Sequence, residues 1–532
     1  MSTSNLFGRW HGYRYFEYEK ELALREVEAQ IGKVVDQLPD GLLIRSTGAS
    51  KDSLQRLTYF REFDGLNGSP VRTHQAVLEG SIWAGSAQGY RPSARQQTRY
   101  SVHGIHEYKG KFNPQIVRAV ANILSVEAGS WMLDPFCGSG TSLVEAAYLR
   151  CNAIGVDLNP MGVLIANAKI ATLHARPAEL QSSVSAIAKQ LRRYTTELSH
   201  HDRVSHRLLS RVAGSEWQKS IPSYDYLSKW FSAPVLCQLA LVLRRINGLT
   251  DLRARDLFLV ILSDIVRNVS LQDPADLRIR RRKNPRPNYP VIHDFLAALE
   301  KRIGTICAAL EAVPVSKHRQ AAFRHDARLP VTGAVKGLPR GGFHTAITSP
   351  PYATALPYID TQRLSLCLLN LIDAGEIAHT ERALVGSREI NRRERLQLEK
   401  DITSNSSRLP SSVASLCREL LAAARCGSHG FRRLNTPGLI YRYFVDMKMM
   451  FTSVARVLRP QARFALVVGP NKTSFDSRGF LIETPALLAN VAESVGYKVE
   501  ELLDLDAYQR FGLHQKNGIK SERLLILRST SK

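Results

Sequence analysis

Short apolar runs alternate with helix-start signals between residues 113 and 175. Asn113-Pro114 supplies a helix cap and a first-turn proline, and apolar residues follow at helical spacing from Ile116 to Leu124. Residues 132–136 and 153–158 are typical of short buried strands, and a second Asn-Pro helix start follows at Asn159. Strand, helix, strand and helix in this order predict an α/β fold with a doubly wound, mostly parallel sheet.

The same alternation returns near the end of the chain and is expected to complete that sheet. The strands predicted there cover residues 345–348, 463–469, 498–505 and 523–527, and the helices cover residues 444–458 and 484–496. Residues 175–315 read as mostly helical, whereas residues 376–435 are polar, rich in Arg and Ser, and predicted to be irregular. The sheet is therefore expected to carry a large helical insertion.

These patterns divide the chain into six segments. The segments are an N-terminal extension with some helix and a mobile connector (1–100), the first half of the sheet domain (101–175), the helical insertion (176–318), a central strand segment (319–375), the polar segment (376–435) and the C-terminal half of the sheet (436–532).

The length and net charge of the chain indicate how many cores it contains and what kind of partner it binds. A chain of 532 residues is too long for a single compact core, and 72 Lys and Arg against 48 Asp and Glu leave a formal charge of +24. Such an excess predicts a polyanionic partner, most simply nucleic acid. A membrane surface is the weaker alternative, because the sequence shows no lipidation motif and no basic amphipathic anchor.

Cysteine usage and hydropathy bear on the compartment. The seven cysteines occur singly, without a Cys-x-x-Cys pair, which indicates a reducing compartment without a disulfide framework or a zinc cluster. The first ten residues are polar, and no run of about 18 apolar residues occurs. We expect a cytoplasmic protein without a membrane span and without a bound metal.

A glycine-containing loop follows the first predicted strand. Asp134-Pro135-Phe136-Cys137-Gly138-Ser139-Gly140-Thr141 leads into a helix, an arrangement that suits an anionic or nucleoside ligand because glycines allow close approach and helix N-termini offer free N–H donors. Asp157 ends the next strand, where an acidic residue commonly receives ribose hydroxyls. NAD, FAD and S-adenosylmethionine all remain open from the loop alone. Its form differs from Gly-x-Gly-x-x-Gly and from a P-loop, which argues against dinucleotides and ATP.

A Ser-Pro-Pro-Tyr sequence follows another predicted strand and points to a reaction. Two consecutive prolines fix an extended backbone without N–H donors, so that carbonyl acceptors remain. A carbonyl and the Ser349 hydroxyl together accept both hydrogens of an exocyclic amine, which frees the nitrogen lone pair for attack. Pro350 and Pro351 hold the backbone, and Tyr352 would stack on the base. The alternative is a Pro-Pro turn that packs an aromatic ring against the sheet.

With these motifs the chain resembles the DNA amino-methyltransferases, which methylate cytosine N4 or adenine N6 with S-adenosylmethionine. The resemblance implies a Rossmann-like methyltransferase fold, with Ser349 to Tyr352 as the catalytic loop. It implies a cofactor site formed by His106, Tyr108, Lys111, Phe112, Asp134, Pro135, Phe136, Gly138, Gly140, Thr141, Asp157 and Asp326. Asp326 matches the family's contact to the cofactor adenine. The motifs lie in residues 100–175, 320–372 and 435–530.

The form of the catalytic loop favours cytosine N4, because adenine enzymes more often carry Asp or Asn at the position of Ser349. Two features depart from the family pattern: the long helical insertion, and the order of motifs, since many cytosine-N4 enzymes place the catalytic loop first. Adenine N6 is the nearest alternative, and an RNA guanine-N2 methyltransferase is a second. A non-catalytic DNA-binding protein is disfavoured because the four motifs, at residues 106–114, 134–141, 155–160 and 348–352, keep their polar residues.

Two basic segments are candidates for contact with double-stranded DNA, the partner that the resemblance implies. The candidate side chains are Arg278, Arg280, Arg281, Arg282 and Lys283 in the insertion, and Arg388, Arg392 and Arg393 in the polar segment. A solvated charged surface is the alternative for both. The family resemblance also implies companion restriction or defence proteins, because the chain shows no nuclease signature.

Overall fold

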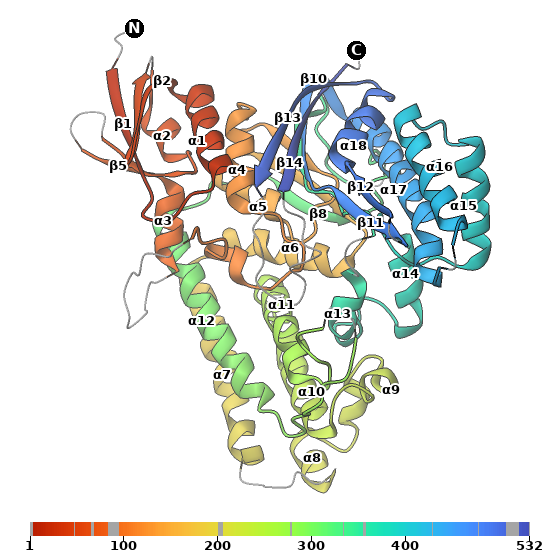
Figure 1. Ribbon diagram of the computed structural model, residues 1–532. Helices are drawn as coiled ribbons and strands as arrows, with labels where there is room; N and C mark the ends of the chain where they lie inside the picture. The colour runs from red at the N-terminus through yellow and green to blue at the C-terminus, as the bar shows by residue number, and fades with distance from the viewer. Residues whose placement is uncertain are drawn as a thin grey trace.

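A computed structural model describes the chain over residues 4–46, 48–64, 69–82, 95–199, 206–276, 279–333, 335–354, 358–427, 429–476, 478–506 and 521–530. A central sheet is flanked by helices, a small N-terminal sheet lies beside it, and a group of long helices extends to one side (Figure 1). The fold is therefore α/β, with additions at the N-terminus and between two strands of the central sheet.

The central sheet has seven strands in the order β13-β14-β10-β9-β6-β7-β8. Their bounds are β6 (Trp131–Asp134), β7 (Asn152–Asp157), β8 (Gln320–Arg324), β9 (Phe343–Thr348), β10 (Leu458–Val468), β13 (Tyr497–Asp506) and β14 (Ser521–Ser529). Only β14 runs antiparallel to its neighbours. The predicted doubly wound, mostly parallel sheet is confirmed. Its strand order reverses between β6 and β9, and ligands of such sheets bind at the carboxyl ends of strands at this point.

Alternate side chains of the sheet enter different cores. Met132 packs in a core with α4 (Pro114–Ile123) and α5 (Thr141–Tyr148), whereas the next residue, Leu133, packs in a core with α17 (Phe431–Ala455) and α18 (Thr484–Glu493). Because successive strand residues point to opposite faces, this alternation shows that helices cover both faces of the sheet.

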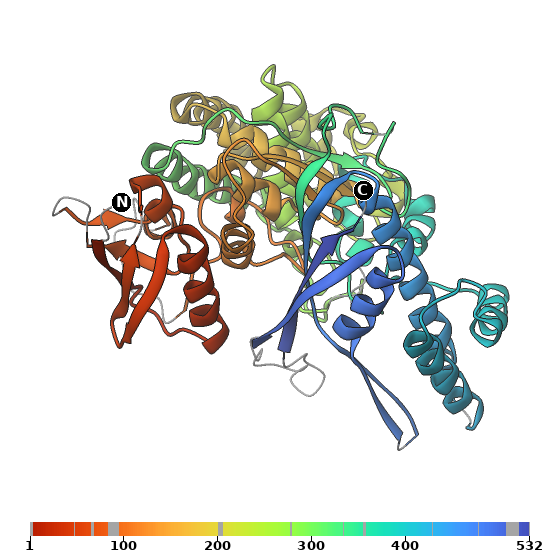
Figure 2. The same ribbon diagram turned by 90° about the horizontal axis from the view of Figure 1, so that it is seen from above.

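The N-terminal extension contains a five-stranded antiparallel sheet, which the sequence analysis did not predict. The strands are β1 (Ser4–Trp10), β2 (Gly32–Leu38), β3 (Gly41–Ser46), β4 (Phe60–Phe63) and β5 (Val71–Arg72), and the helices are α1 (Glu17–Gln30), α2 (Lys51–Gln55) and α3 (His74–Ser81). Seen from above, this unit lies beside the central sheet (Figure 2). Helix α1 contacts α4, so the unit packs directly on the central domain.

The insertion is helical, as predicted. It follows α6 (Pro160–Leu173) of the sheet domain and comprises α7 (Pro177–Ser199), α8 (His206–Ala213), a 3-10 turn (Trp217–Ser220), α9 (Tyr224–Leu227), α10 (Ala233–Asn247), α11 (Leu252–Val269) and α12 (Val291–Ala312). One apolar core joins α10, α11 and α12 to α6 and to α13 (Tyr358–Leu368). The insertion is thus anchored beside the carboxyl ends of the strands rather than tethered loosely.

The prediction that residues 376–435 are irregular was wrong. They contain α14 (Ile377–Ala383), α15 (Arg392–Ser404), α16 (Ser411–Arg425) and the start of α17, with a short 3-10 turn (Ala374–Glu376) before them. Asn391 and Glu394 form a capping box for α15, and α16 buries Val413, Cys417 and Leu420 at helical spacing. The many Arg and Ser residues obscured both signals because they lie mainly on solvent-facing surfaces.

Between β10 and α18 a hairpin of β11 (Asn471–Phe475) and β12 (Arg478–Ile482) projects from the body of the protein (Figure 2). A 3-10 turn (Ser101–Gly104) precedes α4. Within the described residues, none of the helices combines the length and apolar character needed to cross a bilayer.

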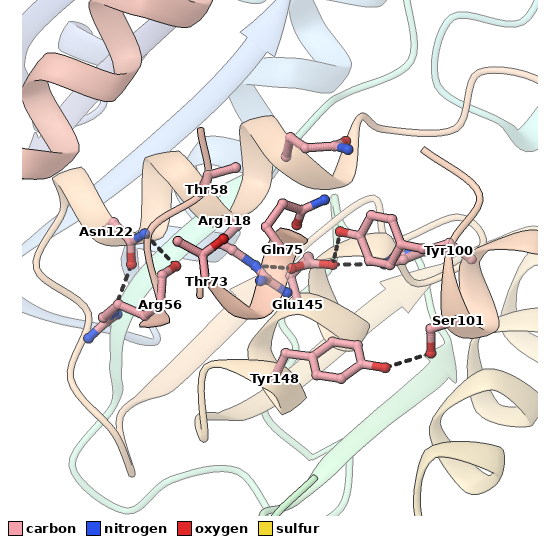
Figure 3. Close-up of polar contacts among 12 residues, drawn as sticks. Arg56, Thr58, Thr73, Gln75, Tyr100, Ser101, Arg118, Asn122, Glu145 and Tyr148 are labelled. Carbon is pink, nitrogen blue, oxygen red and sulfur yellow. Dashed lines mark hydrogen bonds and ion pairs between the residues drawn. The ribbon is translucent and has the colours of Figure 1, made fainter. Parts of the chain in front are cut away.

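A buried polar cluster joins the segment before α4 to α5 (Figure 3). The Glu145 carboxylate accepts hydrogen bonds from Tyr100 Oη at 2.8 Å, His103 Nε2 at 2.8 Å and Arg118 Nε at 2.7 Å. Burial alone would raise the pKa of Glu145, but Arg118 and the His103 and Tyr100 hydrogen bonds outweigh it and lower the pKa to about 2. Glu145 therefore carries the charge that balances the buried Arg118.

We expect Glu145→Gln to lower the free energy of unfolding by about 3 kcal/mol, because it leaves the Arg118 guanidinium, which is 1% exposed, without a counter-charge. Denaturant unfolding followed by circular dichroism measures the change. Glu21→Gln is the matched control: Glu21 pairs with Arg25 on the surface of α1, and its loss should cost less than about 1 kcal/mol. Equal losses for both variants would contradict the assigned role of Glu145.

Candidate active site

The glycine loop (residues 134–141) adopts a conformation that needs its two glycines. Gly138 and Gly140 have φ angles of 47° and 76°, in the left-handed region. A Cβ atom on Gly140 would lie 2.7 Å from the Ala166 Cβ of α6, and one on Gly138 would lie 3.3 Å from the Tyr108 ring. The loop is therefore pressed between α6 and Tyr108, and larger residues at these positions would displace it.

Asp134 ties the glycine loop to the central strand β9. Its carboxylate accepts hydrogen bonds from Thr348 Oγ1 at 2.6 Å, from the Phe136 backbone N–H at 3.0 Å and from the Ser142 hydroxyl. Burial raises the pKa of Asp134 to about 6, against the effect of these hydrogen bonds. Asp134 thus connects the glycine loop to the strand that leads into the Ser-Pro-Pro-Tyr loop (residues 349–352).

Asp157 lies at the end of β7 and faces the glycine loop. One carboxylate oxygen accepts from the Gly138 N–H at 2.9 Å and the other from the Asn159 N–H at 2.8 Å. Burial raises the pKa of Asp157 to about 6, and these two bonds oppose the rise. A carboxylate has about four acceptor positions, so Asp157 keeps acceptor capacity for a ligand.

A cavity of about 620 Å³ lies against these residues at the carboxyl ends of β6, β7, β8 and β9. Eight residues that the sequence analysis singled out line it: Tyr108, Pro135, Phe136, Gly138, Asp157, Asp326, Ser349 and Pro351. The glycine loop, Asp157 and the Ser-Pro-Pro-Tyr loop, which are far apart in the sequence, therefore share one cavity.

Eight further lining residues were not among the predicted site residues: Gly110, Leu158, Asn159, His325, Ala327, Tyr358, Leu384 and Val385. Asn159 and His325 lie close in sequence to the predicted residues Asp157 and Asp326, and this proximity was the only signal that could have identified them. Asn159 Nδ2 donates to Tyr108 Oη at 3.3 Å and to Gln362 Oε1 at 2.8 Å, which links the cavity wall to α13. Leu384 and Val385 reach the cavity from the end of α14, which no local motif indicated.

The remaining six predicted cofactor residues do not line the cavity. His106 is buried, with Nδ1 4.0 Å from Asp264, and burial lowers its pKa to about 4. Lys111 Nζ donates to the backbone oxygens of Thr98 at 2.7 Å and His103 at 3.3 Å, and burial lowers its pKa well below the usual value. Phe112, Asp134, Gly140 and Thr141 likewise do not line the cavity, and Phe112 packs against the core. Direct cofactor contact by these six residues stays a prediction.

The Ser-Pro-Pro-Tyr loop is held from several sides. The Tyr352 hydroxyl donates to Glu522 of β14, and Asn471 Nδ2 of β11 donates to the Ala353 carbonyl at 2.7 Å. A Cβ on Gly386 would lie 2.6 Å from the Tyr352 carbonyl oxygen, so the segment after α14 runs directly against the loop. Pro350 and Tyr352 do not line the cavity in this arrangement, whereas Ser349 and Pro351 do.

Asp326, which lines the cavity, belongs to an ion-pair network. Its carboxylate accepts from Arg328 Nη2 at 2.7 Å, and Arg328 Nη1 also donates to Asp446 of α17 at 3.0 Å. The paired guanidinium fixes the Asp326 carboxylate at the cavity wall and ties it to α17.

The two basic segments are separate in the fold, because residues 279–283 belong to the insertion and Arg392 and Arg393 begin α15. Arg280 pairs with Asp276 at 3.2 Å, Arg281 lies over the Trp230 ring, and Arg282 Nη2 donates to the Asn268 carbonyl at 2.8 Å. Lys283, Arg388, Arg392 and Arg393 are exposed, and Arg388 Nε donates to the Thr354 carbonyl. Arg278 lies outside the described residues.

Comparison with known proteins gives partial matches. The family described as "RMKL-like, methyltransferase domain" matches residues 105–198, which contain the glycine loop and Asp157. The chain is 44% identical over 78 residues to the Type II methyltransferase M.MjaII of Methanocaldococcus jannaschii, covering 15% of this chain and 14% of that protein.

Two further relatives differ in extent. The Type II methyltransferase M.BsoBI of Geobacillus stearothermophilus is 22% identical over 457 residues, covering 80% of this chain and 82% of that protein. A tRNA (guanine(10)-N2)-dimethyltransferase of Methanothermobacter thermautotrophicus is 38% identical over 52 residues, covering 10% of this chain and 16% of that protein. Together with the domain match, these similarities support methyltransferase activity.

Proposed function

We propose, on the premise of these methyltransferase matches, that the chain transfers a methyl group from S-adenosylmethionine to an exocyclic amine of a base in double-stranded DNA, with cytosine N4 as the favoured acceptor. One observation carries the proposal: the cavity brings Asp157 and the glycine loop together with Ser349 and Pro351. A nucleoside-binding carboxylate and a set of amine acceptors thus border the same space.

The residues of the cavity fit the proposed cofactor, whose sulfonium supplies the electrophilic methyl group. Asp157 offers acceptors to the ribose hydroxyls, and Phe136 and Leu158 offer apolar surface beside it. In the proposal Asp326 accepts from the adenine amino group, and the positive end of α5 behind the glycine loop is directed at the ligand. Tyr108 closes the wall against Gly138.

The proposed chemistry then needs only positioning and polarisation. The Ser349 hydroxyl and a neighbouring backbone carbonyl accept the two amine hydrogens, so the nitrogen lone pair turns toward the methyl carbon. The nitrogen–carbon bond forms as the carbon–sulfur bond breaks, and the amine then loses one proton to solvent. The target base must first leave the duplex, at a cost of a few kcal/mol that stacking and phosphate contacts offset.

The extent of sequence similarity to the two kinds of relative favours DNA over RNA as the methyl acceptor. The relative named as a Type II methyltransferase covers 80% of this chain, including the insertion, whereas the tRNA methyltransferase match covers 10%. The formal charge of +24 suits either polyanion. The Ser at position 349 supports cytosine N4, with adenine N6 as the alternative.

The test is methyl transfer by the purified full chain from tritiated S-adenosylmethionine to mixed-sequence duplex DNA, with tRNA in parallel and nucleoside analysis of the product. We expect label in N4-methylcytosine, and none with the Pro350→Ala variant. Label in N6-methyladenine would replace the favoured acceptor by the alternative. Label only in tRNA guanine would overturn the DNA proposal, and no cofactor binding by calorimetry would overturn methyl transfer altogether.

A further inference from the structure

A second hollow, of about 1220 Å³, is bordered by Thr354, two residues after the Ser-Pro-Pro-Tyr loop. We call it the α17 groove. It is lined by Thr354, Asp360, Glu381, Arg388, Glu389, Ile390, Phe431, Arg432, Asn435, Thr436 and Leu439. Most of its far wall comes from the first turns of α17.

Two backbone segments separate the groove from the cavity, and each lines both. Ser349 and Pro351 face the cavity while Thr354 faces the groove. Leu384 and Val385 face the cavity while residues 388–390 face the groove. The Arg388 guanidinium donates to the Thr354 carbonyl and so joins the two segments. The groove and the cavity are therefore neighbours along both of these segments.

Asn435 gives the groove an unused hydrogen-bond acceptor. Its side chain is 3% exposed, and its Oδ1 atom accepts no hydrogen bond from any described residue. Buried polar atoms are nearly always paired, so an unpaired amide oxygen at a groove wall indicates a donor that arrives with a ligand. Asn435 lies on the same helix as Phe431, one turn further along.

Phe431 and Arg432 complete the wall with groups suited to nucleic acid. Phe431 is 58% exposed at the start of α17, although a large aromatic side chain is usually covered. Arg432 is also exposed, and no ion pair to it occurs among the described residues. Two of the acidic side chains that line the groove already have partners within the protein. Asp360 pairs with Arg363, and Glu381 accepts a hydrogen bond from the Ile359 N–H at 2.9 Å.

We propose that the α17 groove binds a DNA base adjoining the methylated base and selects it by its amino group. The Phe431 ring stacks on that base, the Asn435 oxygen accepts from its exocyclic amine, and Arg432 contacts a nearby phosphate. An acceptor suits the exocyclic amine of cytosine, adenine or guanine, a group that thymine lacks. Stacking on Phe431 supplies affinity that does not depend on base identity. The inference rests on the proposed function and adds specificity residues to it.

The test uses the full chain and a duplex library with random bases around the methylated position, whose products are sequenced. We expect Phe431→Ala to raise the KM for DNA about tenfold, with the S-adenosylmethionine Kd unchanged. Asn435→Leu should admit thymine at one neighbouring position, while Asn435→Asp, which keeps an acceptor, should retain the wild-type preference. Arg432→Ala should reduce the salt dependence of DNA binding by about one phosphate contact.

Arg433→Ala is the matched control, since Arg433 is exposed on the same helix but does not line the groove. The inference is overturned if Phe431→Ala leaves the KM for DNA unchanged, or if Arg432→Ala and Arg433→Ala lower the salt dependence equally. The same holds if the variants change transfer to tRNA and not to DNA. An inactive wild-type protein would instead contradict the proposed function, so the two failures are distinct.

Discussion

Asp157→Ala is expected to lower the affinity for S-adenosylmethionine at least about 100-fold. The substitution removes the proposed acceptor of the ribose hydroxyls, and a hydrogen bond to a charged group is worth about 1.5–3 kcal/mol. It also leaves the Gly138 and Asn159 N–H groups, now bonded at 2.9 and 2.8 Å, without their acceptor. Both losses fall on the same wall of the cavity. Isothermal calorimetry with the purified chain measures the change.

The control for this variant is Asp40→Ala, because Asp40 pairs with Arg9 on the exposed surface of the N-terminal sheet. It should bind the cofactor as the wild type does. Circular dichroism must show that Asp157→Ala is folded. A folded Asp157→Ala protein with wild-type affinity would contradict the placement of the ribose at β7.

The same carboxylate predicts a pH dependence. Burial raises the pKa of Asp157 to about 6, and a ligand hydroxyl that donates to the carboxylate favours the ionised form. Protons therefore compete with the cofactor: affinity should be constant above about pH 7 and fall as the pH drops through 6. Asp134 also has a pKa of about 6, so Asp157→Asn, which cannot ionise, identifies the source by removing the dependence.

Features that depend on neighbouring residues could be predicted from the sequence. The Asn113 side chain accepts from the Gln115 N–H, and the Asn159 side chain accepts from the Met161 N–H, so both Asn-Pro helix starts are confirmed. Each cap is complete within three residues, which is why a local pattern is sufficient. The parallel sheet follows from the alternation of such elements.

Features that depend on pairing between residues far apart in the chain could not be predicted from the sequence. In the N-terminal sheet β1 pairs with β3 and β4. Strand β2 has no buried residue and β4 is only four residues long, so neither carries a clear strand signal. Leu384 and Val385 line the cavity, and the adjoining Gly386 lies directly against Tyr352. The residues around position 384 contain no motif that predicts this contact, since it is formed by packing between elements.

Substitution of Ser349 tests whether cofactor binding and methyl transfer depend on different residues of the cavity. Ser349→Ala is expected to lower kcat about 100-fold while the S-adenosylmethionine Kd changes less than about threefold. Ser349 lines the cavity, but in the proposal its hydroxyl contacts only the acceptor amine, and loss of one preorganised polar group at a reacting centre costs about 10²–10³ in rate. Single-turnover transfer from tritiated cofactor to duplex DNA measures the rate of the methyl-transfer step itself, free of product release.

Ser404→Ala is the matched control, because the Ser404 hydroxyl donates to the Lys400 carbonyl on the exposed face of α15. It should retain full activity. Unchanged single-turnover rates in Ser349→Ala would remove the hydroxyl from the mechanism and leave amine polarisation to the proline carbonyls alone. Loss of cofactor affinity equal to the loss of rate would instead make Ser349 part of the cofactor site. The ratio of the change in transfer rate to the change in S-adenosylmethionine Kd therefore determines whether Ser349 acts on the acceptor amine or on the cofactor.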